Sequence, residues 1–463
     1  MFGKVLVANR GEIACRVLRT CRRLGIATVA VYSDADRNAP HVALADEAVR
    51  LGEAPVRQSY LDVGALVAAI RETGAEAVHP GYGLLSESAA FARAVADAGA
   101  VFVGPAPEVL ERLGDKVAAR AIARSVGVEP PPGTDEAVPV GDAATLAAAA
   151  ERIGYPLLVK AAAGGGGIGM TIVRDASELA RAAQTASDRA RQAFADERVY
   201  LERWIERPRH VEVQIVADTR GAFVALGERE CSVQRRHQKI IEETPCPAGF
   251  FTSEAGNARR EALWNAALAI ARAAGYSGAG TVEFIVDARG NAFFLEVNAR
   301  LQVEHPVTEI VSGIDLVEMQ LRVAAGEELP SEIRAPVLTG AAIEARLYAE
   351  DPARGFVPQP GRIDRLVLPE GMPGVRVDSG VAVGYEVTPH YDPLLAKIVA
   401  HGTTREEARS RLLSALTATE IELVGPKGPR RTNRDLLCAI LEHPEFVAGE
   451  YDTGLLSRLD TLP

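Results

Sequence analysis

The first part of the chain alternates short β-rich runs with helical runs, and this alternation restricts the fold more than any other feature. Residues 4–8 are β-rich, residues 12–24 carry apolar side chains at helical spacing and end at Gly25, and residues 27–32 are β-rich again. The pattern continues as a helix over 60–73, a strand over 77–79, a helix over 89–98 and a strand over 101–103. Strands that alternate with helices through short loops predict a parallel, doubly wound sheet.

A run of prolines marks a boundary further along. Residues 130–133 read Pro-Pro-Pro-Gly, so they break the helix that the pattern predicts over 114–128 and indicate a hinge. A smaller unit follows over about 134–203, and a larger mixed region runs from about 204 to the end. At roughly 100–200 residues per domain, the 463 residues are expected to form about three domains or subdomains, α/β at first and α+β later.

Composition excludes several classes of function. Lys plus Arg number 51 and Asp plus Glu 62, so the net charge is −11 and general nucleic-acid binding is not expected. The five scattered cysteines lack zinc-site spacing and are interpreted as free thiols in a reducing compartment. No apolar run reaches about 18 residues, and the N-terminus turns polar at 9–12, so neither a membrane span nor a signal peptide is expected. A cytoplasmic enzyme or subunit remains, and any anionic ligand of it needs a local cluster of bases.

A glycine-rich loop, residues 164–169, holds five glycines in six positions between β-rich runs at 157–161 and 170–173. It lacks the Gly-Lys-Ser/Thr of a P-loop and the helix that follows a dinucleotide fingerprint, so it is interpreted as a hairpin tip. Such a tip can close over nucleotide phosphates, and a flexible turn without function is the alternative. Lys160 on the preceding strand could place a cation in the same cleft or could simply be solvated.

The strongest local signal is a predicted hairpin with its turn at 287–291. Because side chains alternate along a strand, Glu296, Asn298 and Arg300 share one face, and the position of the turn places Glu283 opposite Glu296 or nearly so. The other face is apolar and carries Leu295, Val297 and Ala299. Opposed carboxylates destabilise a sheet, but two carboxylates and an amide oxygen suit Mg²⁺. The alternative is an exposed edge strand with surface charges.

The residues after this hairpin are candidates for chemistry on an anion. Arg300, Gln302 and Glu304 come at the end of a strand and before Pro306, as on an active-site loop. A guanidinium binds a planar oxyanion through its fork, and a nearby carboxylate can act as a base. A basic cluster at 228–239 would supply the local positive potential that an anionic ligand needs. The alternative is that this cluster is a solvated loop.

With these pieces placed, the sequence resembles the biotin carboxylases of the ATP-grasp superfamily over nearly its whole length. Ten motifs carry the resemblance in order: 8–14, 79–83 with 85–87, 114–116, 152–156 with Lys160, 164–169, 209–212, 231–239, 296–309, 344–346 with 349–352, and 391–397. The resemblance implies an ATP-grasp fold with an N-terminal Rossmann-like parallel-sheet domain, a small lid domain and a C-terminal domain on a mixed antiparallel sheet. The implied boundaries are 1–113 for the N-terminal domain, 114–133 for the hinge, 134–203 for the lid, 204–330 for the catalytic domain and 331–463 for the C-terminal domain.

The resemblance also implies a reaction, the ATP-dependent carboxylation of biotin held on a carrier protein. Bicarbonate attacks the γ-phosphate, which gives carboxyphosphate and ADP, and the carboxyphosphate yields CO₂ to N1′ of biotin. Phosphoryl transfer of this kind depends mainly on positioning and charge neutralisation.

The site residues that the resemblance implies fall into four groups. The catalytic group is Lys239, Arg300, Glu304 and Arg346. Glu304 would deprotonate bicarbonate, as a base beside two cations near neutral pH, and Arg346 would stabilise the biotin enolate. The residues that would bind ATP are Lys116, Lys160, Gly165, Gly166, Gly167, Glu202, Arg203, Trp204, Ile205, His210, Gln234, His237, Glu283 and Glu296. Bicarbonate and biotin would contact Lys239, Arg300, Gln302, Val303, Tyr82 and Arg346, and the metal would be held by Glu283, Glu296 and Asn298.

The implied cofactors are ATP and Mg²⁺ or Mn²⁺, with biotin as the carrier-bound substrate. The implied partners are a biotin carboxyl carrier protein, a carboxyltransferase subunit and a second copy of the chain in a homodimer. The sequence has no Met-Lys-Met biotinylation site, so the carrier is expected on another polypeptide or on a part absent from this chain. Residues 32–38 and 346–351 resemble carboxylases of the methylcrotonyl or propionyl type more than the acetyl type.

Two rival functions stay open at this point: an ATP-grasp carboxylase with a different CO₂ acceptor, and a degenerate ATP-binding structural subunit. Three departures from the family pattern bear on them. Ile168 stands where the glycine loop usually has Arg or Lys, Ala299 replaces a usual Ser or Thr on the buried face, and 425–433 is longer and richer in proline. Since Ile168 removes a cation from above the phosphates, we expect weaker ATP binding or slower turnover.

Overall fold

The N-terminal alternation folds into the parallel sheet that it predicts. The computed structural model describes residues 1–162, 170–235 and 238–459. The first sheet has the order β3-β2-β1-β4-β5, and each neighbouring pair is parallel. Its strands are β1 (Lys4–Val7), β2 (Ala27–Ser33), β3 (Glu47–Gly52), β4 (Ala77–His79) and β5 (Val101–Phe102). Its helices are α1 (Gly11–Arg23), α2 (Pro40–Leu44), α3 (Val63–Thr73) and α4 (Ala89–Asp97).

The core explains why β1 is a continuous apolar run. Val5 and Val7 belong to the apolar cluster on one side of the sheet and Leu6 to the cluster on the other, so both faces are covered. The edge strand β3 was not predicted, because its exposed residues, such as Glu47, give it a polar pattern. Gly25, φ +71°, adopts the left-handed conformation expected of a glycine after a helix.

The helix that the sequence predicted over 114–128 is α6 (Lys116–Ser125), and α5 (Pro107–Gly114), which was not predicted, precedes it. The break between them falls at Asp115, whose carboxylate accepts hydrogen bonds from the backbone N–H of Val117 (2.9 Å) and Ala118 (3.0 Å). Asp115 is therefore the N-cap of α6, and it makes Lys116 the first residue of that helix.

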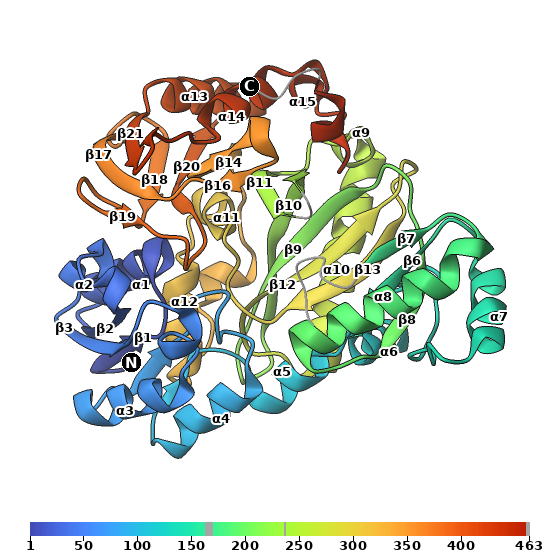
Figure 1. Ribbon diagram of the computed structural model, residues 1–463, viewed down its shortest axis with the longest axis horizontal. Coiled ribbons are helices and arrows are strands. Elements are labelled where there is room, and N and C mark those ends of the chain that lie inside the picture. The colour runs from blue at the N-terminus through green and yellow to red at the C-terminus, as the bar shows by residue number, and fades with distance from the viewer. Residues whose placement is uncertain (163–169, 236–237, 460–463) are drawn as a thin grey trace.

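A small α/β unit follows and protrudes at the right of Figure 1. It contains α7 (Ala143–Ile153), β6 (Leu157–Ala161), β7 (Thr171–Val173), α8 (Ala176–Phe194) and β8 (Val199–Arg203). The strands are antiparallel in the order β7-β6-β8, so the predicted hairpin of β6 and β7 is confirmed. Asp175 caps α8, as its pattern indicated, whereas α7 and β8 were not predicted. Residues 163–169, which the sequence analysis interpreted as a hairpin tip and which include Ile168, lie outside the described residues.

The largest sheet has eight strands in the order β13-β12-β9-β10-β11-β14-β20-β18, with antiparallel pairing between neighbours. Its first five strands along the chain are β9 (Arg209–Ala217), β10 (Phe223–Arg235), β11 (Gln238–Thr244), β12 (Gly278–Val286) and β13 (Ala292–Asn298). The helices of this region are α9 (Gly249–Thr252), α10 (Glu254–Ala274), α11 (His305–Ser312) and α12 (Leu316–Ala324). The basic cluster at 228–239 lies largely on β10 and β11, so the solvated-loop alternative is wrong.

The last third of the chain completes this sheet and adds a smaller one. Strands β14 (Ala341–Tyr348), β18 (Val375–Ser379) and β20 (Leu394–Gly402) join the large sheet. A four-stranded sheet holds β17 (Gly361–Val367), β19 (Glu386–Val387), β21 (Glu420–Gly425) and β22 (Gly428–Pro429), and a two-stranded one holds β15 (Glu350–Asp351) and β16 (Val357–Pro358). The helices are α13 (Arg405–Thr417), α14 (Arg434–Glu442) and α15 (Pro444–Ala448). The unusual segment at 425–433 begins with the β21–β22 hairpin.

Two expectations from composition can be compared with the structure. Within the described residues, no helix is both long enough and apolar enough to cross a bilayer. All five cysteines are free, and all except Cys438 are buried.

Candidate functional site

One large cavity, of about 1320 Å³, gathers the predicted site residues. It lies where the N-terminal sheet, the small α/β unit and the large sheet meet. Its lining includes every predicted site residue that the structure describes: Tyr82, Lys116, Lys160, Glu202, Arg203, Trp204, Ile205, His210, Gln234, Lys239, Glu283, Glu296, Asn298, Arg300, Gln302, Val303, Glu304 and Arg346. The remaining four, Gly165, Gly166, Gly167 and His237, lie outside the described residues.

Two lysines stand at the end of the cavity next to the small α/β unit. Lys116 pairs with Glu296, and the Nζ of Lys160 lies 3.2 Å from Oε1 of Glu202. Lys160 is 5% exposed, so the alternative of a solvated lysine is wrong. Arg120, which the sequence analysis missed, contacts the other oxygen of Glu202 at 2.8 Å. Lys116 and Lys160, which carboxylates hold in place here, can form ion pairs with an anionic ligand.

The same end of the cavity has apolar walls. Leu158 and Met170 contribute from the small unit, and Ile285 and Leu295 from the β12–β13 hairpin. Leu295 was expected on the face of β13 opposite Glu296, but both residues line the cavity. Glu283 pairs with Glu296 and Phe284 pairs with Phe294, so Leu295 is the extra residue of a β-bulge in β13. An apolar slot beside cations suits a planar aromatic group that carries phosphates.

The segment that ends β8 supplies the other predicted nucleotide contacts. Arg203 and Trp204 line the cavity. The guanidinium of Arg203, however, donates to the carbonyl of Ile153 at 3.0 Å. The backbone N–H of Trp204 donates to the carbonyl of Pro156 at 3.1 Å. The side chain of Arg203 is therefore used within the small unit.

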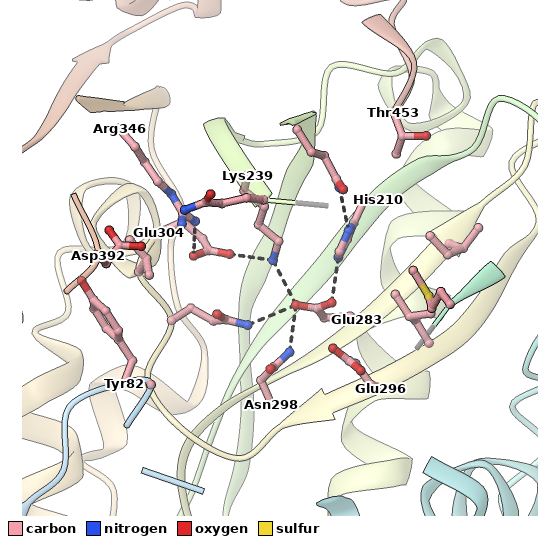
Figure 2. A pocket seen from close by; sticks show the side chains of 18 of the residues that line it. Tyr82, His210, Lys239, Glu283, Glu296, Asn298, Glu304, Arg346, Asp392 and Thr453 are labelled. Atoms are coloured by element: carbon pink, nitrogen blue, oxygen red, sulfur yellow. Dashed lines mark hydrogen bonds and ion pairs between the residues drawn. The ribbon is translucent and has the colours of Figure 1, made fainter. Parts of the chain in front are cut away.

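The carboxylate hairpin has the predicted register. Glu283 on β12 pairs with Glu296 on β13, and the turn falls where the sequence placed it. β13 is an edge strand, as the alternative interpretation proposed, but the carboxylates are not surface charges: Glu283 is 4% exposed, and both glutamates line the cavity. Figure 2 shows Glu283, Glu296 and Asn298 close together below its centre.

Glu283 is the most heavily contacted carboxylate of the site. Its Oε1 accepts from Lys239 (2.9 Å), Asn298 (2.8 Å) and Gln302 (3.1 Å), and its Oε2 lies 2.9 Å from Nε2 of His210. Burial acts to raise the pKa of Glu283, but Lys239 and His210 hold it well below its ordinary value. Gln234 in turn contacts Nδ1 of His210 at 3.0 Å. The Glu283 carboxylate is therefore ionised at neutral pH.

Lys239 is surrounded by three glutamates. Its Nζ lies 2.5 Å from Glu212, 2.9 Å from Glu283 and 2.7 Å from Glu304. Behind it, the fully buried Arg229 contacts Glu212 at 2.5 Å. Sequence reasoning gave no role to Glu212 or Arg229, although Glu212 closes the 209–212 motif and could have been singled out there. The alternation of acids and bases holds Lys239 charged and pointing into the cavity.

Glu304 lies between two cations. Its Oε1 contacts Lys239, and its Oε2 accepts from Arg346 at 2.8 Å; Arg346 also pairs with Glu242 at 2.5 Å. Burial acts to raise the pKa of Glu304, but Lys239, Arg346 and Arg229 hold it well below its ordinary value. The cations therefore favour the ionised carboxylate of Glu304 in the free site, which is the form that can accept a proton.

Arg300 faces the cavity from the loop that follows β13. Its guanidinium donates to Gln302 Oε1 and to Asn298 Oδ1, both at 2.9 Å. Glu87, from the N-terminal domain, accepts from Nε of Arg300 and from the backbone N–H of the buried Ala299, both at 2.9 Å. Glu87 is a residue of the 85–87 motif to which the sequence analysis assigned no role.

The hairpin also suits a hard divalent cation by its donor chemistry. Two carboxylates on paired positions and an amide face one cavity, and oxygen ligands of this kind are what Mg²⁺ prefers. The like charges of Glu283 and Glu296 are compensated in part by Lys239 and Lys116. A cation between the two carboxylates would relieve the remaining repulsion.

Comparison with known proteins gives consistent matches along the chain. The family model described as the biotin carboxylase N-terminal domain matches residues 1–110, the carbamoyl-phosphate synthase L chain ATP binding domain matches 115–332, and the biotin carboxylase C-terminal domain matches 344–458. The biotin carboxylase of Halalkalibacterium halodurans is 49% identical over 458 residues, which are 99% of this chain and 98% of that protein. The propionyl-CoA carboxylase alpha chain of Ruegeria pomeroyi is 46% identical over 99% of this chain and 68% of its own.

A solved structure agrees with these matches. The biotin carboxylase domain dimer of the 2-oxoglutarate carboxylase of Hydrogenobacter thermophilus, in complex with MgADP, ADP and bicarbonate, is 42% identical to this chain. The two superpose with a TM-score of 0.92, and the match covers 99% of this chain and 97% of that one.

Proposed function

The chain belongs to the biotin carboxylase family, and from this premise we propose how its cavity carries out the ATP-dependent carboxylation of biotin. The fold is the ATP-grasp fold, the cofactors are ATP and Mg²⁺, and the co-substrates are bicarbonate and carrier-bound biotin. One observation carries the assignment of roles: Glu304 contacts both Lys239 and Arg346 at one end of the cavity that, at its other end, holds Lys116 and Lys160.

In the proposal, ATP occupies the slot between the small unit and the hairpin. Lys116 and Lys160 exchange their glutamate partners for phosphate oxygens, and residues 202–205, His210 and Gln234 border the nucleoside. Gly165, Gly166, Gly167 and His237 are assigned to the same ligand from the resemblance alone. Glu283, Glu296 and Asn298 hold the metal, which neutralises phosphate charge when bound.

Bicarbonate is proposed to bind between Lys239, Arg300, Gln302 and the backbone of Val303. The anion adds negative charge beside Glu304 and thereby raises the pKa of this carboxyl, so that it can take the bicarbonate proton. The carbonate oxygen freed in this way attacks the γ-phosphorus, the bond to the β-phosphate oxygen breaks, and ADP leaves. The carboxyphosphate then splits into CO₂ and phosphate, the phosphate takes the N1′ proton of biotin, and N1′ bonds to CO₂. Arg346 faces the enolate oxygen of biotin that develops in this step, with Tyr82 beside the ring.

The remaining partners are also proposals. The biotin carboxyl carrier protein and a carboxyltransferase are expected on other polypeptides or on further sequence, in a homodimeric, cytoplasmic assembly. The likeness to a propionyl-CoA carboxylase alpha chain supports an acyl-CoA as the final acceptor, and the dimer of the solved relative supports a homodimer. The domain boundaries given by the sequence stay predictions.

Bicarbonate-dependent ATP hydrolysis, measured with and without free biotin, tests the function. We expect hydrolysis that requires bicarbonate and is stimulated by biotin. We expect Glu304→Gln to lose about 100-fold or more, because the proton acceptor is gone. Glu318→Gln is the matched control, since Glu318 pairs with Arg23 away from the cavity. Bicarbonate dependence without stimulation by biotin would favour a different CO₂ acceptor, and no hydrolysis at all would favour a degenerate subunit.

A further inference from the structure

Lys397 on β20 is a fully buried lysine, 0% exposed, to which neither the cavity chemistry nor the proposed function assigns a role. A buried ammonium group is costly unless carboxylates and carbonyls surround it. It closes the 391–397 motif, and it pairs in register with Arg346 on β14 and with Asp378 on β18. The lysine therefore lies one strand away from the arginine that faces the cavity.

The contacts of Lys397 come from three distant parts of the chain. Its Nζ donates to the backbone carbonyl of Val303 at 2.8 Å, lies 3.1 Å from Oε2 of Glu12 and lies 3.8 Å from Oδ2 of Asp378. Val303 belongs to the loop between β13 and α11, Glu12 to the first turn of α1, and Asp378 to β18. One ammonium group thus joins the active-site loop to the first and last domains.

The contact with Val303 places Lys397 directly behind Glu304. The loop is held at its start by Glu87, which accepts from the N–H of Ala299, and near its end by Lys397. A displaced Val303 carbonyl would move the next residue, Glu304, away from Lys239 and Arg346. A small misplacement of reacting groups costs up to about 100-fold in rate.

The second partner of Lys397 also leads back to the cavity. Glu12 is 4% exposed, and its other oxygen accepts a hydrogen bond from the hydroxyl of Tyr82, which lines the cavity. Lys397 is therefore linked to the active-site loop directly and, through Glu12, to Tyr82, which lies near Asp392 in Figure 2.

We propose that Lys397 is a positioning residue: it fixes the Val303 carbonyl, and through it Glu304, in the geometry that bicarbonate requires. This inference rests on the proposed function, because it assigns bicarbonate to that loop. Lys397 does not contact the cavity and takes no proton in this account.

The test is the steady-state kinetics of bicarbonate-dependent ATP hydrolysis in Lys397→Met. Methionine is similar in length but cannot donate to Val303. We expect the KM for bicarbonate to rise at least 10-fold and kcat to fall 10- to 100-fold. We expect the KM for ATP to stay within about twofold, because Lys116 and Lys160 keep their partners.

Two further variants separate positioning from folding. Glu12→Gln/Lys397→Met removes the carboxylate that the single variant leaves uncompensated, so it is expected to recover thermal stability without recovering the bicarbonate KM. Lys4→Met is the matched control, because Lys4 also donates to a carbonyl (Thr73, 2.8 Å) and to a glutamate (Glu47, 2.7 Å), but at the start of β1 and outside the cavity lining. We expect Lys4→Met to leave both KM values unchanged.

Several outcomes would overturn the proposal. They are an unchanged KM for bicarbonate in a folded Lys397→Met protein, an equal rise in the KM values of ATP and bicarbonate, and failure of both Lys397 variants to fold, which would make the lysine purely structural. Failure of the proposed function is recognised separately, since the unsubstituted protein would then show no bicarbonate-dependent hydrolysis.

Discussion

Glu242 and Glu344 face each other in register across β11 and β14, and both are fully buried. Glu242 pairs with Arg346, whereas the carboxylate of Glu344 has no hydrogen-bond partner among the described residues. Burial raises the pKa of Glu344 well above its ordinary value and that of Glu242 to about 7, although Arg346 opposes both shifts. A protonated carboxyl is therefore part of the wall behind the active site.

This predicts a pH dependence of stability. A carboxyl with a raised pKa in the folded state keeps its proton between its usual value near 4.5 and about 7, whereas the unfolded chain gives it up. Stability therefore falls as pH rises through this window and levels off above it. As pH rises through this window, we expect the free energy of unfolding of the unsubstituted protein to fall by up to about 3 kcal/mol more than that of Glu242→Gln. Thermal midpoints of both proteins at pH 5, 6, 7 and 8 test this, and parallel curves would contradict it.

Ile168 supports a second prediction at this scale, which rests on the sequence alone because the residue lies outside the described part of the chain. Ile168→Arg places a cation in the glycine loop, so we expect the KM for ATP to fall roughly fivefold, the equivalent of about 1 kcal/mol. Ile168→Gln is the control, since it is polar and carries no charge. Unchanged kinetics in the arginine variant would show that the family cation is dispensable here.

Sequence reasoning found the residues that face the ligands better than those that support them. Tyr82, Lys239 and Glu304 belong to recognisable motifs, and all three line the cavity. Glu87 was missed because its partner Arg300 is 213 residues away in the sequence, and Arg229 because its pairing with Glu212 depends on the register of β9 with β10. The spacing of residues in the sequence indicates the period of a strand or helix. It does not indicate which acidic and basic side chains will pair in the folded protein.

At the scale of elements, the β12–β13 hairpin was predicted almost completely. Alternation and the turn at 287–291 determined its register, and the pairing of Glu283 with Glu296 follows from them. The bulge at Leu295 could not be predicted, because no glycine or other local signal accompanies the extra residue. The predicted helix over 114–128 was shortened by Asp115, a cap residue that lay inside an otherwise helical pattern.

The cap of α6 yields a prediction with an internal control. Asp115 caps the helix that begins at Lys116, and Asp142 caps α7 by the same two-bond pattern, at 3.1 Å to both Ala144 and Thr145. We expect each change to alanine to cost about 1 kcal/mol of stability. Only Asp115→Ala should also raise the KM for ATP several-fold, because it loosens the backbone of Lys116. Equal KM values in the two variants would contradict this link between capping and nucleotide binding.

At the scale of the whole molecule, the cavity is shared by units that are far apart in sequence. Asn9, Lys160, Glu283 and Arg346 line it from the N-terminal domain, the small unit, the hairpin and β14. The sequence predicted the α/β character of the N-terminal region. It could not predict that β11 pairs with β14, since that contact joins Ile241 to Ala345 and has no local signature.

This arrangement predicts where a ligand stabilises the protein. A nonhydrolysable ATP analogue with Mg²⁺, at 100 times its Kd, is expected to add about 2.7 kcal/mol to the stability of the folded state. Hydrogen exchange should slow on β6 and β12, which border the slot, and stay unchanged on α13 and α14, which do not. Uniform protection over the whole chain, or none on β6, would contradict the proposed binding mode.

The eight-stranded sheet runs without interruption from the hairpin to β18, across the gap between the matched family models for the ATP-binding region (residues 115–332) and the C-terminal region (344–458). In a chimera of two relatives, the gap between those models is thus a poor crossover point. β11 would come from one parent and β14 from the other, and their side chains would have to pack together along the whole pair of strands. The small α/β unit forms a sheet of its own, and it is the better segment to exchange.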